Sequence, residues 1–79
     1  MKIFMKFTEF KEKIIEISKN INKDESILKI ICLYNEQKKT LEKKIKKSCF
    51  NLCYKKIKEI EKNNVLSNES KLLIELFEF

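Results

Sequence analysis

The chain has 79 residues, enough for one small domain over 1–79, and carries a net charge of +6 with 43% hydrophobic residues, too many for a disordered chain. It contains no Gly, Pro, Ala, Arg, His or Trp. The lack of His excludes the usual catalytic triads and general bases that work near neutral pH, and the lack of Gly excludes phosphate-binding and dinucleotide-binding loops. We therefore predict a protein that is not an enzyme and that holds no cofactor and no metal.

The first predicted helix covers about residues 3–20. Its apolar residues recur at steps of three and four, which is typical of an amphipathic helix and not of a strand. These positions are Ile3, Phe7, Phe10, Ile14, Ile17 and Ile21. Charged residues occupy the opposite face, so we expect this helix to pack on a neighbour through one stripe.

The second predicted helix is long, covering about residues 24–62. Asn22, with Glu25 three residues later, has the spacing of a capping box, and Asp24 is an alternative cap. The three-and-four spacing then continues through Ile27, Ile31, Tyr34, Lys38, Leu41, Ile45, Cys49, Leu52, Lys56 and Ile60. The lysines at positions 38 and 56 interrupt this stripe and leave open a break, a splayed helix end, or a lysine whose aliphatic stem covers apolar surface.

The third predicted helix is short, covering about residues 68–79, with Ser67 as its N-cap. Apolar residues occupy most of its circumference, which indicates a helix that is buried or lies in an interface. The predicted protein interface consists of Leu72, Leu73, Leu76, Phe77 and Phe79.

These elements predict an all-α protein in a three-helix, antiparallel arrangement with a long central helix and a short hydrophobic C-terminal helix. The first helix would cover the N-terminal half of the central helix, and the last would fold back on its C-terminal half. Residues 36–47 would then be the least covered segment, because they hold only two aliphatic residues in twelve.

The positive charge is concentrated in the middle of the chain. Residues 36–62 hold ten lysines and four glutamates, for a net +6, whereas residues 63–79 have a net charge of −2. The absence of Gly, Pro, Ala and Arg points to an AT-rich genome, which raises the lysine content everywhere, but this excess is local. It suggests an anionic neighbour.

We predict that this neighbour is nucleic acid, contacted by Lys38, Lys39, Lys43, Lys44, Lys46 and Lys47. Lysine binds phosphate as a point charge, and no Arg is present for bidentate recognition of guanine, so backbone contacts are expected and base recognition is not. A solvated helix face in a lysine-rich proteome is the alternative interpretation.

The three cysteines are the remaining candidates for metal binding or disulfide formation. Cys49 and Cys53 lie one turn apart on the same helical face. We expect all three cysteines to be small core residues, since free Cys is among the most buried residue types. Half of a metal site and disulfides between helices are the alternatives.

The segment Cys49-Phe50-Asn51-Leu52-Cys53 resembles the first CX3C motif of the small Tim chaperones of the mitochondrial intermembrane space. That resemblance implies a helical hairpin held by two disulfides, assembled in hexameric rings that escort membrane-protein precursors. Leu72 and Leu76 stand where the two partner cysteines of that family would be, and the resemblance covers about thirty residues.

The sequence shows no segment of the length and apolarity of a membrane span, no secretory signal and no paired cysteine framework. We expect an intracellular, reducing compartment, by default the cytoplasm. The predicted function is a small accessory or structural subunit that docks on a ribosome or another ribonucleoprotein. The alternatives are a protein–protein interaction module (a helical adaptor, an oligomer subunit or a small-Tim-like chaperone) and a small effector or inhibitor of a host partner.

Overall fold

The computed structural model describes residues 6–77, which form four α-helices and no strand. Their bounds are Phe7–Ser18 for α1, Lys23–Gln37 for α2, Lys43–Asn63 for α3 and Asn68–Phe77 for α4. The predicted all-α class is confirmed. No helix within these residues is long and apolar enough to cross a membrane.

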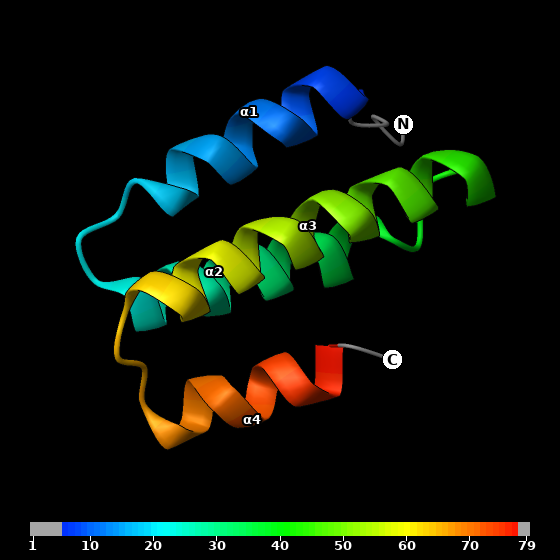
Figure 1. Cartoon of the computed structure of the whole chain (residues 1–79). Helices are drawn as coiled ribbons and strands as arrows, with labels where there is room; N and C mark the ends of the chain where they lie inside the picture. Colours follow the sequence, from blue (N-terminus) through cyan, green and yellow to red (C-terminus); the bar gives the residue numbers. More distant parts are fainter. Residues whose placement is uncertain (1–5, 78–79) are drawn as a thin grey trace.

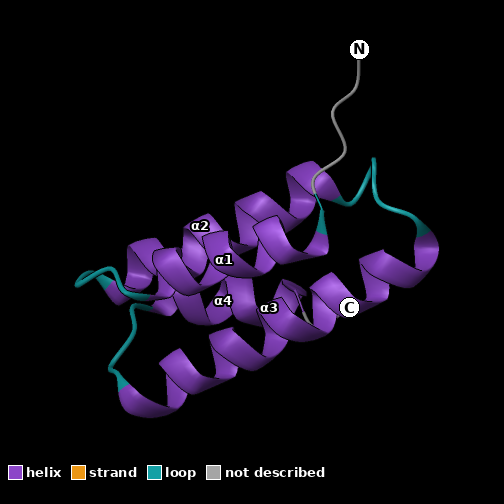
Figure 2. Ribbon diagram, turned by 90° about the horizontal axis from the view of Figure 1, so that it is seen from above, coloured by secondary structure: helices purple, strands orange, loops and turns teal. Residues whose placement is uncertain are grey.

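The helices run alternately in opposite directions, with α2 and α3 forming a central hairpin (Figure 1). Helix α1 packs against both helices of the hairpin, and α4 packs chiefly along α2 on the other side. Seen from above, α1 lies in front of the hairpin, with α2 and α3 on either side of it (Figure 2). The described chain measures 39 × 24 × 19 Å.

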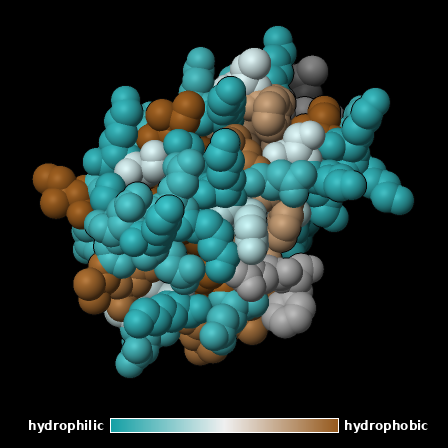
Figure 3. Space-filling view, viewed as in Figure 1, coloured by the Kyte–Doolittle hydropathy of each residue, from teal (hydrophilic) through white to brown (hydrophobic). Residues whose placement is uncertain are grey.

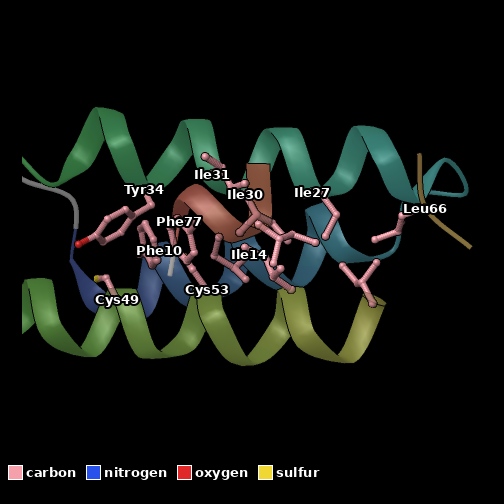
Figure 4. Close-up of a cluster of buried hydrophobic side chains, with 13 residues drawn as sticks. Phe10, Ile14, Ile27, Ile30, Ile31, Tyr34, Cys49, Cys53, Leu66 and Phe77 are labelled. Atoms are coloured by element: carbon pink, nitrogen blue, oxygen red, sulfur yellow. The ribbon is translucent and has the colours of Figure 1, made fainter. Parts of the chain in front are cut away.

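The core lies between the helices of the hairpin and receives side chains from α1 and α4 (Figure 4). Two residues of α1, Phe10 and Ile14, are completely buried, as the predicted stripe requires. Ile17 is partly buried, and Ile21 projects from the loop after α1 with 97% of its surface exposed. The predicted apolar stripe therefore extends past the end of the helix, and Ile3 lies outside the described residues.

The segment predicted as one central helix over 24–62 is two helices, separated by a turn at residues 38–42. The turn closes through hydrogen bonds to the carbonyl oxygen of Gln37, donated by the amides of Thr40 and Leu41 and by the Thr40 hydroxyl. A continuous helix would place Lys39 and Lys43 in a like-charge i, i+4 pair. Folding back instead buries the apolar faces of α2 and α3 against each other, a gain that a separated long helix does not have.

The connection between α1 and α2 is tied by short polar contacts. Asn22 is the N-cap of α2, as predicted, and its side chain accepts a hydrogen bond from the amide of Glu25 at 3.3 Å. The hydroxyl of the fully buried Ser26 donates to the carbonyl oxygen of Ile17 at 3.0 Å. This bond joins the start of α2 to the end of α1.

Helix α4 is held at its N-terminus by Asp24 of α2. One carboxylate oxygen of Asp24 accepts three hydrogen bonds: from the Ser67 amide at 2.9 Å, the Ser67 hydroxyl at 2.8 Å and the Ser70 hydroxyl at 2.6 Å. Ser67 in turn caps α4, since its hydroxyl accepts from the Ser70 amide at 3.2 Å. The predicted cap at Ser67 is confirmed, whereas Asp24 supports α4 and not its own helix.

These hydrogen bonds predict a pH-dependent stability. The bonds from Ser70 and then Ser67 lower the pKa of Asp24 below its usual 3.8. A carboxylate with a lowered pKa in the folded state stabilises the fold above about pH 4, and this contribution is lost as the pH falls through its folded-state pKa. We expect Asp24→Asn to be less stable than the unmodified chain at pH 7, with the difference shrinking below pH 4.

Urea unfolding followed by circular dichroism from pH 2 to pH 7 measures this difference. Glu12→Gln, an exposed carboxylate of α1, serves as the control and should leave stability nearly unchanged. A difference between Asp24→Asn and the unmodified chain that is constant over the whole pH range would contradict the role given to Asp24.

Candidate binding surface

A groove of about 620 Å³ runs between α2, α3 and α4, near the turn at 38–42. Its apolar lining consists of Ile31, Tyr34, Phe50, Leu73, Leu76 and Phe77. Its polar lining consists of Asn35, Lys38, Lys39 and Lys46. The fold therefore brings two sets that lie far apart in the sequence, the central lysines and the leucines of the last helix, to the two sides of one surface.

The floor of the groove is a cluster of three aromatic rings, one from each helix. The Phe77 ring is stacked on that of Phe50, with centroids 4.9 Å apart and an angle of 20° between the rings. It meets Tyr34 edge to face, at 5.4 Å and 85°, and Tyr34 meets Phe50 at 5.7 Å and 67°. Such pairs stabilise packing beyond the burial of area alone, and they fix where α4 lies on the hairpin.

The six predicted nucleic-acid-binding lysines divide into two groups. Lys38, Lys39 and Lys46 line the groove, and Lys38 is partly buried. The other three, Lys43, Lys44 and Lys47, are exposed on the first turns of α3, outside the groove. No residue between Tyr34 and Cys49 is buried, so the prediction that residues 36–47 are the least covered segment is confirmed.

None of these six lysines has an acidic partner among the described residues. Within residues 6–77 the ion pairs are Lys29–Glu25, Lys56–Glu59 and Lys58–Glu61, all outside the turn. The first turn of α3 contains no acidic residue, and its N-cap Glu42 makes no side-chain capping bond. Lysines at a helix N-terminus oppose the helix dipole, so the turn is a region of strong positive potential that an anion would relieve.

The predicted interface of α4 is partly exposed and partly buried. Leu72 and Leu76 are exposed by 56% and 61%, and Leu73 is partly buried against the core. Phe77 is only 8% exposed and packs inside the chain, so it does not present a free surface. Phe79 lies outside the described residues. Hydrophobic side chains come to the surface in the lower part of Figure 3, the region of α4 in this view.

The cysteines are free thiols with contrasting environments. Cys49 and Cys53 are completely buried, as expected for core residues, whereas Cys32 is exposed and the expectation is wrong for it. Burial raises the pKa of Cys53 to about 12, with a further contribution from Cys49, and burial also raises the pKa of Cys49. Thiols of this kind are unreactive.

The structure does not bring together the positions that the small Tim motif would pair. Leu72 and Leu76 are exposed on α4, whereas Cys49 and Cys53 point into the core between α2 and α3 (Figure 4). Among the described residues, no group of three or more His, Cys, Asp or Glu side chains is placed to hold a metal ion.

Comparisons with known proteins add no family to this description. No protein-family model, no curated protein and no solved structure matches the chain.

The groove also contains residues that the sequence did not single out as binding residues. Phe50 was not among the predicted positions, and Ile31 and Tyr34 were expected only as positions of the apolar stripe of the second helix. One signal was available in the sequence: Phe50 follows Lys46 by four residues and so shares its face of the helix. The contact of Phe50 with α4 crosses 27 residues of sequence and has no local signature.

The burial of the thiols predicts their reactivity. We expect one fast-reacting thiol, Cys32, when the folded protein meets a thiol-specific disulfide reagent such as 5,5′-dithiobis(2-nitrobenzoate) at pH 8, and three thiols after unfolding in guanidinium. Cys32→Ser should remove the fast phase and leave two thiols in guanidinium. One free thiol after unfolding of the protein purified without reductant would contradict this picture, because it would mean that Cys49 and Cys53 have been oxidised.

Proposed function

We propose that this protein is a small, basic, non-enzymatic accessory subunit that docks on a larger assembly containing structured RNA, such as a ribosome or another ribonucleoprotein. The observation that carries the proposal is the gathering of six lysines around one turn, with no acidic partner among the described residues. Closely spaced phosphates of folded RNA supply the complementary charge, and their contacts with lysine release bound counter-ions.

The residue types favour contacts with the RNA backbone. Lysine is a point charge without the planar fork that pairs with a base edge, and the chain has no Arg. Proteins that bind single strands add aromatic platforms on which bases stack. Here the rings of Tyr34 and Phe77 are each 8% exposed and are packed against Phe50, so they offer no such platform. The lysines and the buried rings of the groove therefore favour recognition by phosphate spacing and shape.

A protein–protein interaction module is the second candidate function. The observation that favours it is the exposure of Leu72 and Leu76 on α4, because two large apolar side chains one turn apart are typical of a helix that meets another protein. The helical adaptor, the small-Tim-like chaperone and the host effector differ in their partners. The six lysines around the turn at residues 38–42, called the lysine turn below, favour none of these three over RNA docking.

The test uses the three lysines outside the groove. We expect Lys43→Gln, Lys44→Gln and Lys47→Gln, combined, to weaken binding to a structured RNA hairpin and to reduce the slope of log affinity against log salt by about 2 to 3. Fluorescence anisotropy at 50–300 mM salt measures both quantities, and co-sedimentation with ribosomes measures docking on the assembly.

The matched control is the triple variant Lys11→Gln, Lys13→Gln and Lys19→Gln, which removes the same charge from exposed positions in and just after α1. It should change the affinity little and leave the salt slope nearly intact. If both triple variants weaken RNA binding equally, binding depends only on net charge. If neither variant weakens it, the RNA proposal is contradicted.

A further inference from the structure

The exposed side of α4 carries an apolar stripe bordered by an acid. Leu72 and Leu76 are more than half exposed, Leu73 lies beside them at the edge of the groove, and Glu69 is exposed one turn earlier. Glu69 lies three and four residues before Leu72 and Leu73, which lie four and three residues before Leu76, so the four positions form one continuous face of the helix.

Lysines border the same surface at the C-terminal end of this face. Leu76 and Leu73 line the groove together with Lys38, Lys39 and Lys46, which have no acidic partner among the described residues. The segment 63–79 has a net charge of −2, whereas residues 36–62 carry +6. One chain therefore has an apolar helix face with an acidic residue at its edge, and beside it an apolar groove bordered by lysines.

The positions on this face are self-complementary. If two α4 helices pack antiparallel about a two-fold axis between Leu72 and Leu73, then Leu72 of one copy lies opposite Leu73 of the other, and Glu69 lies opposite Leu76. Because Leu76 borders the lysine groove, Glu69 of the second copy would lie beside Lys38, Lys39 or Lys46. The symmetry repeats the same contacts on the other side, as an isologous interface requires.

We propose that the face of α4 formed by Glu69, Leu72, Leu73 and Leu76, together with the adjoining lysine groove, is the interface of a two-fold symmetric dimer of this chain. The leucines exclude water at the centre, and the Glu69–lysine pairs at the two ends set the antiparallel orientation. A dimer also buries apolar surface that a chain of only 79 residues leaves exposed.

This interface uses the groove lysines Lys38, Lys39 and Lys46, which belong to the six lysines of the proposed RNA surface, and leaves the other three for RNA. Lys43, Lys44 and Lys47 lie outside the groove and stay exposed in the dimer, which would present two lysine turns to one RNA. Dimerisation is measured without RNA, so failure of the dimer leaves the RNA proposal standing, and failure of RNA binding leaves the dimer standing.

Sedimentation equilibrium of the purified full-length chain from 1 to 300 µM tests the proposal. Buffer at 150 mM salt with reductant is used, because the net charge of +6 on each copy opposes association when it is poorly screened. We expect a monomer–dimer equilibrium for the unmodified chain, and we expect Leu76→Glu to weaken it by at least about 30-fold.

Two controls keep this result interpretable. Ile21→Glu makes the same substitution type and charge change at a 97% exposed position in the loop after α1, and it should dimerise like the unmodified chain. Circular dichroism shows whether Leu76→Glu remains folded, as its 61% exposure leads us to expect.

Charge reversal tests the register without touching the leucines. Glu69→Lys should weaken the dimer, and adding Lys39→Glu to the same chain should restore at least part of the loss, because the two charges exchange places across the interface. Lys62→Glu, an exposed residue at the end of α3, is the control for the second change and should not restore the dimer.

Two outcomes would overturn the proposal. The first is a monomer at every concentration; if its Ile31 and Phe50 resonances also shift on addition of an RNA hairpin or an acidic peptide, the groove is occupied by that partner and not by a second copy. The second is a dimer that Leu76→Glu and Ile21→Glu affect equally.

Discussion

The contact of Phe77 with Phe50 and Tyr34 is the interaction on which the binding surface depends. A helix of ten residues such as α4 is unstable in isolation, so its position is set by what it packs against. At its C-terminal end the three rings meet within 5.7 Å of one another, and at its N-terminal end Asp24 of α2 accepts three hydrogen bonds from Ser67 and Ser70. These two attachments, at opposite ends of α4, create the groove beside the lysine turn.

The lysines at the N-terminus of α3 are placed where they lower the stability of the fold. At the positive end of the α3 dipole the N-cap Glu42 is acidic, but it makes no side-chain capping bond. The lysines in the first turn of α3 form no ion pair among the described residues. A sequence optimised for folding alone would place acidic residues there. Departures from local rules of this kind tend to occur where a surface serves a function. The lysine turn therefore fits a site whose electrostatic strain is relieved by an anionic partner, and the short α4 fits a helix that completes its packing in an assembly.

Local patterns predicted much of the fold. Apolar spacing located the helices, and the caps at Asn22 and Ser67 lie where side-chain chemistry requires them. The division of the central helix at residues 38–42 was left open, because the three-and-four spacing passes through the turn unchanged and the burial gained by folding back is a long-range effect. For the same reason nothing local revealed that Asp24 contacts Ser70, 46 residues away. The candidate lysines were identifiable from charge, but their division between groove and open surface was not.

The position of α4 on the hairpin is the central claim, and nuclear Overhauser contacts between ring protons test it most directly. In the full-length chain with selectively labelled Phe and Tyr, the account predicts cross-peaks between Phe77 and both Phe50 and Tyr34, whose ring centroids lie 4.9 and 5.4 Å from that of Phe77. Their presence would establish the groove and the face of α4 that borders it. A Phe77 ring without contacts to either residue would mean that α4 lies elsewhere, and the binding surface described above would not exist.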